Sequence, residues 1–413
     1  MEKLAIHGGN PAKTVPYTYG KRFGDAELAN LKEALEQNTL FYWSGNMTKR
    51  LCKKFAELYG EKYCVATSSG TASIHVALGA LGIGPGDEVI TSPITDKGSI
   101  IGILYQNAVP VFADLDPHTY NMTPQSIEEK ITERTKAIVV VHLAGNAAEI
   151  DEIVRIAKKH NVYVIEDCAQ TYCCEYKGKY VGTWGDIGCF SLNDFKHISA
   201  GDGGLVLING DNEELYHKAF MFADKNYNRF GEELVKNVPS LAPNYRMNEL
   251  TAAVGLAQLD KVVDICKKRN IYGDRLTEAL KDIPGISVHK VLDGCKCSYW
   301  FYMLRINPDE FTVSRTELSK ACNAEGTYAS DGYIRIPVYL EDMFKNRTAY
   351  LGGTEYPFDG THGRYIEYKE GDCPVAEEIL KTCMNVSVDE FFTEQDFEET
   401  VKGLKKVFTY YHK

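Results

Sequence analysis

Short apolar runs alternate with amphipathic stretches along the first half of the chain. Runs rich in valine and isoleucine indicate strands over residues 63–67, 87–91, 110–114, 137–142, 162–167, 187–191 and 204–208. Between most of them apolar residues recur at helical spacing, as in 71–82 and 149–160. Strands that alternate with helices are typical of an α/β architecture, and near-continuous apolar strands are typical of a sheet covered on both faces. This half therefore predicts a large domain built on a mostly parallel sheet.

The second half shows a different pattern. Residues 247–280 form one long helical pattern, which predicts a spine that leads out of the sheet domain. Beyond it the pattern predicts two strands and then two helices, at 298–306, 333–339, 373–383 and 393–411. Residues 345–372 are rich in glycine, tyrosine and proline and indicate a long loop. We therefore expect a large domain over residues 1–262 and a smaller C-terminal α+β domain over residues 263–413.

Composition narrows the class of protein. The chain has 413 residues, of which 44% are hydrophobic and 25% charged, as in an ordinary enzyme of two or three domains. A net charge of −11 argues against nucleic acid as a partner. We find neither an apolar signal core nor an apolar run that could span a bilayer, so we expect a cytoplasmic protein without a membrane partner. The twelve cysteines lack the paired spacing of a zinc site, which predicts reduced thiols and no metal.

The residues that follow each strand are the candidates for a site. In an open parallel sheet, ligands bind beyond the carboxyl ends of the strands. The run 63–67 is followed by Ser-Ser-Gly-Thr-Ala-Ser, in which Gly70, Thr71 and Ala72 would open a helix. Backbone N–H groups and the helix dipole at such an N-terminus favour a phosphate. The alternative is an ordinary serine or threonine N-cap, which needs no ligand.

Two ionisable residues follow later strands. Asp167 ends the run 162–167, where its carboxylate could hold a proton on a ring nitrogen or be a solvated turn residue. Ser191 ends another run, and Lys196 follows just before a glycine-rich turn. A lysine in such a setting can act as an amine nucleophile and form a Schiff base, although a surface lysine in a turn is commoner. Together, a phosphate cradle, a carboxylate and this lysine are what pyridoxal phosphate (PLP) requires.

A nicotinamide-binding domain is the rival interpretation. The glycine-rich stretch GIGPGDEV, residues 82–89, lies between a predicted helix and a predicted strand. The dinucleotide fingerprint lies between a strand and a helix instead. The position of the glycines therefore argues against this alternative.

The motifs resemble those of the DegT-type sugar aminotransferases, which are fold-type I PLP enzymes. The matching segments occur in the family's order over most of the chain: SSGTAS, LGIGPGDEVI, VPVFADLDPHTYN, IEDCAQ, GDIGCFSLNDFKHISAGDGG, NYRMNELTAAVGLAQL and CPVAEEI. The resemblance implies an enzyme that moves an amino group from L-glutamate or L-glutamine to a keto-sugar or keto-cyclitol. It also implies a homodimer with shared active sites.

The resemblance implies a role for each matching position. Lys196 matches the lysine that holds PLP as a Schiff base, and Asp167 matches the acid that keeps the pyridine nitrogen protonated. Gln170 matches a residue close to the cofactor ring, and Asn244 matches a phosphate ligand that reaches across from the partner subunit. The positions that match the phosphate cradle are Gly70, Thr71, Ala72 and Ser191.

Three positions depart from the family's pattern. Asp96 stands where family members commonly carry an aromatic residue stacked on the pyridine face. It could hydrogen-bond a substrate hydroxyl or the phenolic oxygen of the cofactor, so we count it among the cofactor-binding residues. Tyr172 and Asn193 stand where histidine is frequent. We expect all three to line the substrate side and to indicate an unusual acceptor.

Two alternative functions remain open. In related PLP-dependent dehydratases a histidine replaces the lysine and a C–O bond breaks. His197 stands beside Lys196, but Lys196 occupies the matching place, which favours transamination. A non-catalytic PLP-binding regulator would bind the cofactor without turning over amino donors, although the sequence shows no evident DNA-binding module.

Several other polar residues receive simpler interpretations. We expect His75 to be packed rather than catalytic. Arg246 could meet a substrate carboxylate or form a structural ion pair. We expect Tyr328, Asp331 and Tyr333 to line the acceptor pocket from the second domain.

Overall fold

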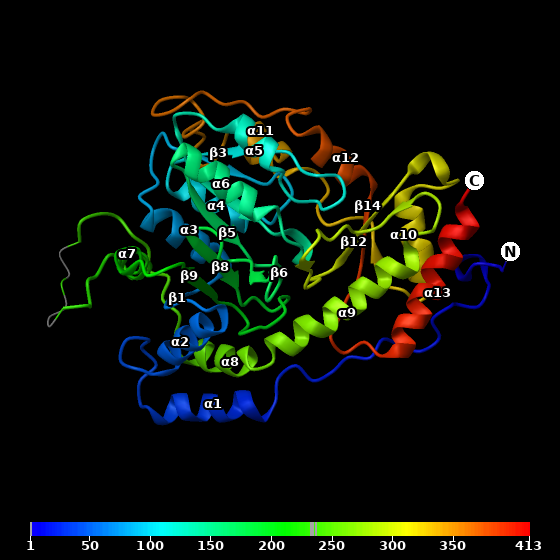
Figure 1. Ribbon diagram of the computed structural model, residues 1–413, viewed down its shortest axis with the longest axis horizontal. Helices are drawn as coiled ribbons and strands as arrows, with labels where there is room; N and C mark the ends of the chain where they lie inside the picture. Colours follow the sequence, from blue (N-terminus) through cyan, green and yellow to red (C-terminus); the bar gives the residue numbers. More distant parts are fainter. Residues whose placement is uncertain (1, 232–234, 236–237) are drawn as a thin grey trace.

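The computed structural model describes residues 2–231, 235 and 238–413, and a seven-stranded sheet lies at the centre of its first half (Figure 1). Its strand order is β1-β9-β8-β5-β4-β2-β3. Five neighbouring strands from β8 to β3 run parallel, whereas β9 is antiparallel to both β1 and β8. The strands are β1 (Tyr63–Thr67), β2 (Glu88–Thr91), β3 (Val109–Phe112), β4 (Thr135–Val141), β5 (Tyr163–Asp167), β8 (Ile187–Ser191) and β9 (Gly204–Ile208). The predicted α/β fold with a mostly parallel sheet is confirmed.

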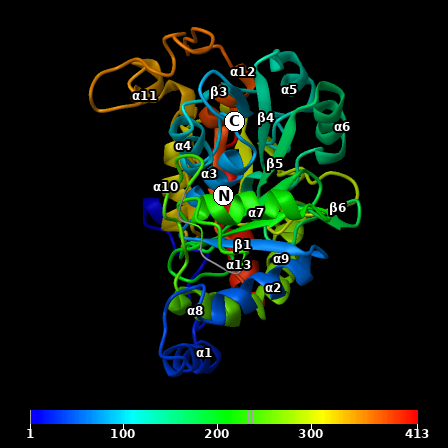
Figure 2. The same ribbon diagram turned by 90° about the vertical axis from the view of Figure 1, so that its left-hand side faces the viewer.

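Alternate residues of the central strands face two separate cores. In β4, Ala137 and Val139 belong to one apolar cluster, and Ile138 and Val140 to the other. Helices α3 (Gly70–Ala80) and α7 (Glu213–Ala223) supply the first cluster. The second is covered by α2 (Met47–Tyr59), α5 (Pro124–Lys130), α6 (Ile150–His160) and α8 (Glu249–Leu259), while α4 (Gly98–Tyr105) contributes to both. Figure 2 shows α5 and α6 together on one side of β4 and β5. Burial on both faces explains the continuous apolar character of these strands.

The long helical pattern over residues 247–280 forms two helices rather than the single one predicted. These are α8 and α9 (Val262–Leu280). At the break, the N–H of Asp260 donates to the carbonyl of Ala257 (3.3 Å), and that of Lys261 donates to Gln258 (3.0 Å). Such bonds over three residues tighten and end an α-helix. The side chains of Gln258 and Lys261 then donate to the same carbonyl oxygen, that of Arg22 (3.0 and 3.1 Å).

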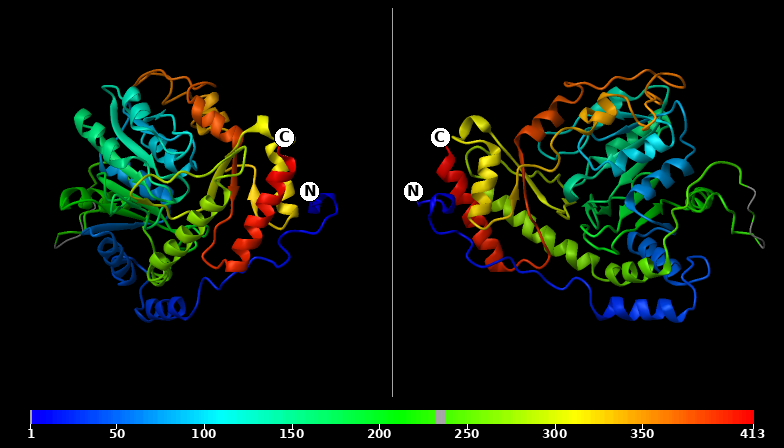
Figure 3. Two further views of the ribbon diagram at one scale, coloured as in Figure 1. Left: turned by 45° about the vertical axis from the view of Figure 1, so that its right-hand side comes forward. Right: turned by 180° about the vertical axis from the view of Figure 1, so that it is seen from behind.

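A second, antiparallel sheet lies at the far end of α9. Its order is β10-β12-β14-β13, and its strands are β10 (Ile286–Ser287), β12 (Tyr302–Ile306), β14 (Cys383–Val386) and β13 (Ala329–Ser330). Apolar side chains of α9, α10 (Arg315–Ala324) and α13 (Glu394–Tyr411) form one core with it. Figure 3 shows both termini at this end, with α13 beside α9. The arrangement is α+β, and the division at residues 262 and 263 stays a prediction.

Among the sequence predictions for the second half of the chain, one strand is wrong, and the helices and the loop are present. The strand predicted over residues 333–339 is wrong, because its described backbone forms only the short 3-10 helix Val338–Leu340 at its end. Pro337 lacks the N–H that a central strand would donate. The predicted helices are present as α12 (Pro374–Thr382) and α13, and residues 346–372 form the predicted long loop. Inside that loop Phe358 is fully buried.

The remaining elements complete the frame. Helix α1 (Asp25–Glu36) packs on α8. A small sheet in the order β11-β6-β7 joins the two halves of the chain, because β11 (Cys295–Lys296) pairs with β6 (Glu175–Tyr176). The other short elements are η1 (Ala5–His7), β7 (Lys179–Tyr180), η2 (Leu143–Gly145), η3 (Pro308–Glu310) and α11 (Asp342–Lys345). Among the described helices, none combines the length and apolar character that crossing a membrane requires.

Gly145 lies where the segment after β11 meets the large sheet. Its φ is +90°, and a Cβ atom there would lie 2.4 Å from the backbone nitrogen of Tyr299. The N–H of Ser298 donates to the carbonyl of Gly145 (2.9 Å), and the N–H of Trp300 donates to that of Ala144 (3.0 Å). A side chain at this position would therefore separate two backbones that are hydrogen-bonded to each other.

We expect Gly145→Ala to lower the free energy of unfolding by about 2 to 4 kcal/mol, because it combines a strained φ with a backbone clash. The matched control is Gly178→Ala, at a φ of +79° with nothing within 4 Å of the added Cβ. That control should cost only about 1 kcal/mol. Urea unfolding of both variants measures the difference, and equal losses would contradict a close contact at Gly145.

Candidate active site

Most of the predicted site residues meet in one cavity of about 240 Å³ at the carboxyl end of the parallel strands. The predicted residues that line it are Gly70, Thr71, Asp96, Asp167, Gln170, Ser191 and Lys196. Ala72 and Asn244 are not among its lining residues. Asn244 is exposed and forms an antiparallel bridge with Asp224 elsewhere on the surface. The sheet topology thus brings together segments that are far apart in the sequence.

The N-terminus of α3 forms one wall of the cavity. The hydroxyl of Ser69 accepts the N–H of Ala72 (3.0 Å), so the N-cap that the sequence offered as an alternative is present. Gly70 brings the first turn of α3 against β8, because a Cβ there would lie 2.7 Å from Cβ of Ser191. The hydroxyls of Thr71 and Ser191 line the cavity at the positive end of the helix dipole. This wall suits an anion such as a phosphate.

Asp167 presents a buried carboxylate to the cavity from the end of β5. Its side chain accepts a hydrogen bond from the hydroxyl of Ser99 (2.6 Å) and another from the N–H of Ala169 (3.0 Å). Burial raises the pKa of Asp167, and these two hydrogen bonds and the charge of Lys196 oppose that rise. The Ser99 hydroxyl is itself paired with that of Thr95 (2.6 Å). The carboxylate is therefore held in one orientation by α4, a contact that sequence reasoning missed.

Lys196 lies in the turn after β8 and is largely buried. Burial lowers the pKa of its amine, while the carboxylates of Asp167 and Asp96 raise it. Its Nζ lies 3.8 Å from the ring centroid of Trp300, a residue that the sequence did not single out. The neighbouring His197 lies in the core, and its Nε2 donates to the carbonyl of Ser298 (3.0 Å). Lys196, and not His197, is among the residues that line the cavity.

Gln170 connects the cavity with the second sheet's part of the chain. Its Oε1 accepts the N–H of Ala144 (3.0 Å), and its Nε2 donates to the hydroxyl of Tyr333 (3.1 Å). Of the three residues predicted to line an acceptor pocket, only Tyr333 has this link. Tyr328 stacks on Tyr17, and Asp331 accepts from Thr316. None of the three is among the residues that line the cavity, so their place beside an acceptor stays a prediction.

The three residues that depart from the family's pattern do not all lie on the cavity wall. Asp96 and Asn193 line the cavity as predicted. Tyr172 does not, because it is fully buried, packs against Phe190 and donates its hydroxyl to the carbonyl of Ser191 (2.9 Å). Asp96 is exposed, and its Oδ1 accepts the N–H of Gly98 at the start of α4 (2.8 Å). An aspartate at this place therefore shapes a turn on the cavity wall and offers no ring for stacking.

Two further polar residues have structural partners. His75 is buried on α3, where its ring nitrogens lie 3.0 Å from the Tyr245 hydroxyl and from Oε1 of Gln106. Burial lowers its pKa, and the predicted packing role is confirmed. Arg246 forms an ion pair with Asp224 (3.0 Å), which is the structural alternative of its two interpretations.

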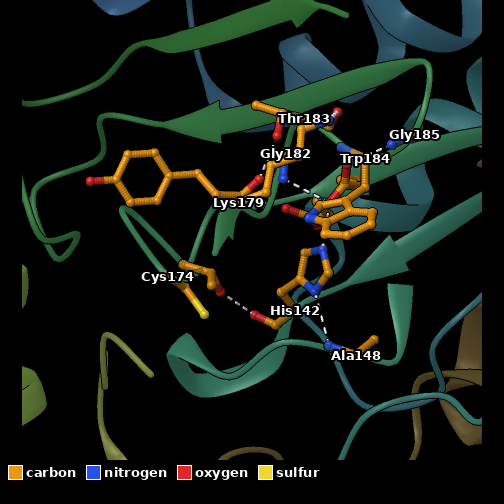
Figure 4. A network of polar contacts seen from close by, with 12 residues as sticks. His142, Ala148, Cys174, Lys179, Gly182, Thr183, Trp184 and Gly185 are labelled. Carbon is orange, nitrogen blue, oxygen red and sulfur yellow. Dashed lines mark hydrogen bonds and ion pairs between the residues drawn. The ribbon is translucent and has the colours of Figure 1, made fainter. Parts of the chain in front are cut away.

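A buried network directly behind Asp167 fastens β5 to the loop 182–185. His142 lies between the N–H of Ala148 and the carboxylate of Glu166, with distances of 3.1 and 3.0 Å (Figure 4). Glu166 also accepts three backbone N–H groups, those of Gly182, Trp184 and Gly185. His142, Glu166 and Cys168 lie close enough together to hold a metal ion. Both nitrogens of His142 already have hydrogen-bond partners, so we interpret the cluster as a structural hydrogen-bond network that fixes the end of β5.

Comparison with known proteins agrees with this geometry. The sequence matches the model of the DegT/DnrJ/EryC1/StrS aminotransferase family over residues 21–357. The chain belongs to this family. The aminotransferase is 30% identical over 391 residues to the spore coat polysaccharide biosynthesis protein SpsC of Bacillus subtilis (strain 168), covering 93% of this chain and 95% of the relative. It is 31% identical over 424 residues to an L-glutamine:2-deoxy-scyllo-inosose aminotransferase of Micromonospora echinospora, covering 99% and 98%.

The fold is shared with solved structures as well. The X-ray structure of an aminotransferase from Psychrobacter cryohalolentis superimposes on this chain with a TM-score of 0.85 at 31% identity, covering 96% of this chain and 100% of that one. Membership of the family makes this chain an enzyme, a PLP-dependent aminotransferase.

The cavity's buried charges predict how the cofactor-free chain responds to Lys196→Met. The pKa of Lys196 is lowered on folding, so the folded chain disfavours the ammonium and loses stability wherever the unfolded lysine is protonated. Methionine keeps the apolar stem without the charge. We expect it to raise the free energy of unfolding by about 1 kcal/mol at neutral pH.

The direction in which this stability difference changes with pH can be checked by repeating the denaturation of both chains at several pH values. The wild-type chain gains stability as pH rises above the folded pKa of Lys196 toward the higher pKa of an unfolded lysine. The advantage of Lys196→Met should therefore shrink as pH approaches 10. An advantage that is constant with pH would show that the lysine's charge is not its source.

Proposed function

We propose that this aminotransferase moves an amino group from L-glutamate or L-glutamine to a keto-sugar or keto-cyclitol, with Lys196 as the residue that binds PLP covalently. One observation carries the proposal. A helix N-terminus, a buried carboxylate and a desolvated lysine line the same cavity, on α3, β5 and the turn after β8. These are the three groups that PLP needs for its phosphate, its ring nitrogen and its aldehyde carbon.

The residues present fit this cofactor. Gly70, Thr71 and Ser191 would hold the phosphate, where the close approach of α3 to β8 leaves room only for glycine at position 70. Asp167 would hold a proton on the ring nitrogen, since the hydrogen bonds from Ser99 and Ala169 favour its charged form. When bound, PLP supplies an electron sink for the carbon that loses a proton.

Lys196 would move that proton. Its amine would accept the proton from the α-carbon of the donor and return it, acting first as a general base and then as a general acid. Burial lowers the pKa of the amine, which increases the neutral fraction able to accept a proton near neutral pH. The carboxylates of Asp167 and Asp96 limit the shift, so the amine can also give the proton back.

A hydroxyl-rich acceptor has support from the cavity wall and from the relatives. Asp96 and Asn193 put a carboxylate and an amide where the family more often has an aromatic ring and an imidazole. Both can bind hydroxyl groups. The inosose aminotransferase of Micromonospora echinospora acts on a cyclitol, as its name states, which supports a cyclitol or a keto-sugar here.

We further propose that the enzyme is a cytoplasmic homodimer with shared active sites. Asn244 is exposed outside the cavity of its own subunit, as a residue that completes the partner's phosphate site would be. All twelve cysteines lie in the described residues and are free thiols, which supports a reducing compartment.

The visible absorption spectrum tests the cofactor and the donor together. We expect purified enzyme to carry the yellow band of lysine-bound PLP, and L-glutamate or L-glutamine to bleach it as the amino group moves to the cofactor. Lys196→Ala should lack the band of the lysine-bound form. Bleaching with a donor also identifies which of the two is used.

The alternatives predict other results in the same experiment. A regulator would keep its band with both donors, and a dehydratase would remove water from the sugar without adding an amino group to it. Retention of full turnover by Lys196→Ala would contradict the assignment of the lysine.

Mixed dimers test whether subunits share their sites. We expect Asn244→Asp to weaken PLP binding, because a carboxylate would repel the partner's phosphate. Refolding this variant together with Lys196→Ala should restore part of the donor-dependent bleaching, since the hybrid dimer contains one site with both residues intact. Mixing without any recovery would mean that Asn244 serves its own subunit or none.

A further inference from the structure

The backbone turn that carries Lys196 is held from outside by two side chains. The guanidinium of Arg22 donates to the carbonyl oxygens of Asp194, Lys196 and His197, the last at 3.2 Å. The indole Nε1 of Trp300 donates to the carbonyl between them, that of Phe195 (2.6 Å). Four consecutive carbonyl groups are thus bound by residues of the N-terminal segment and of the segment that leads into the second sheet.

Both residues are themselves fixed through their backbone, by hydrogen bonds from α8, from α9 and from the break between them. The carbonyl of Arg22 accepts from Gln258 at the end of α8 and from Lys261 at the break. The carbonyl of Trp300 accepts from Arg269 of α9 (3.2 Å), and its N–H donates to Ala144 (3.0 Å). The break between α8 and α9 therefore has a consequence at the cavity, because the groups that surround it position Arg22.

The ring of Trp300 has a second contact, with the amine itself. Nζ of Lys196 lies 3.8 Å from the ring centroid, within the range of a cation–π interaction. The turn also has hydrogen bonds of its own, since the N–H of Lys196 donates to the carbonyl of Asn193 (2.9 Å) and the hydroxyl of Ser199 donates to Asp194 (3.1 Å). The stem of Lys196 can reach both the indole face and the cavity from a fixed Cα position.

We propose that Arg22 and Trp300 form a clamp that positions Lys196, and that the indole face of Trp300 holds the lysine amine whenever it is not bound to the cofactor. The inference rests on the proposed role of Lys196. The clamp fixes the backbone so that the side chain alone moves between its two positions. Trp300 and Arg22 are positioning residues, because they act on the reaction through the lysine.

The pKa of the Lys196 amine reports on its contact with the Trp300 ring. A ring face stabilises the ammonium, so removing it should lower the pKa of Lys196. The other groups that act on this charge remain in place in such a variant. They are Asp167 and Asp96 across the cavity, Asp202 on its wall, Arg22 beneath the turn and the neutral His197 beside it.

Two variants of Trp300 separate the face from the hydrogen bond. Trp300→Leu removes both, whereas Trp300→Phe keeps an aromatic face and loses the N–H donor. The measurement is the pH dependence of reductive methylation of Lys196 in the cofactor-free chain, read by mass spectrometry. We expect Trp300→Leu to shift the midpoint down by about half to one pH unit, and Trp300→Phe to shift it by less than half as much.

The backbone part of the clamp is tested by the rate at which the cofactor-free chain captures saturating PLP. We expect Arg22→Met to slow capture at high pH by roughly tenfold, because the amine is no longer held in its productive place, and Arg22→Lys to recover part of the rate. Trp184→Phe is the matched tryptophan control, since the indole N–H of Trp184 has no hydrogen-bond partner among the described residues and the cation over its ring is Lys179. It should leave both measurements unchanged.

The outcomes distinguish the two proposals. A wild-type midpoint in Trp300→Leu would contradict the claim that the Trp300 ring holds the amine. A wild-type capture rate in Arg22→Met would contradict the claim that Arg22 positions Lys196. Should Trp300→Leu unfold, Trp300→Met also removes the ring, and its midpoint compared with that of Trp184→Phe decides the first point. If the Lys196→Ala chain captured PLP with the same absorption band as the wild-type chain, the proposed function would fail, while the methylation midpoints would still report on Trp300.

Discussion

The candidate site depends on keeping two opposite charges away from water in the same small cavity. Burial raises the pKa of Asp167 and lowers that of Lys196, so both charged forms are disfavoured by their surroundings. Desolvation of this kind costs free energy that isolated ion pairs often fail to recover. Here each charge has fixed partners, a hydroxyl and a backbone N–H at Asp167 and an indole face at Lys196. The arrangement is therefore unfavourable for stability, and shifted pKa values of this kind are typical of functional sites.

The sheet supplies the rigidity that such a site needs. Asp167 ends β5, and Lys196 follows β8, its parallel neighbour, so one backbone ladder fixes their relative positions. Strand β9, which runs antiparallel to β8, brings the chain back immediately after the turn. The two apolar cores, one on each face, hold this edge in place. The network of His142 and Glu166 then fastens the end of β5 through the residue that precedes Asp167 (Figure 4).

The sequence predicted the parts of the site that depend on local pattern. Every predicted strand of the large sheet is present, and the rule that ligands bind beyond strand ends was enough to find Asp167, Ser191 and Lys196. It missed contacts made across long distances in the chain. Ser99, Arg22 and Trp300 meet Asp167 or Lys196 only after folding and carry no local signal. Tyr172 fails for the related reason that position next to a motif does not decide whether a side chain faces a cavity or a core.

Aromatic rings contact residues of the cavity from the part of the chain around the second sheet, and not from position 96. An aspartate there leaves the wall beside α4 without an aromatic ring. The aromatic rings next to Lys196 and Gln170 are instead those of Trp300 and Tyr333, which lie edge to face with centroids 6.0 Å apart. Both come from the second half of the chain, on either side of β12 and β13. The positions of these rings beside Lys196 and Gln170 therefore depend on how the second sheet docks on the first, through the backbone bonds at Gly145 and the hydrogen bond from Gln170 to Tyr333. A change in that docking would move these rings relative to Lys196 and Gln170, while Asp167 and the start of α3, both fixed by the large sheet, stayed where they are.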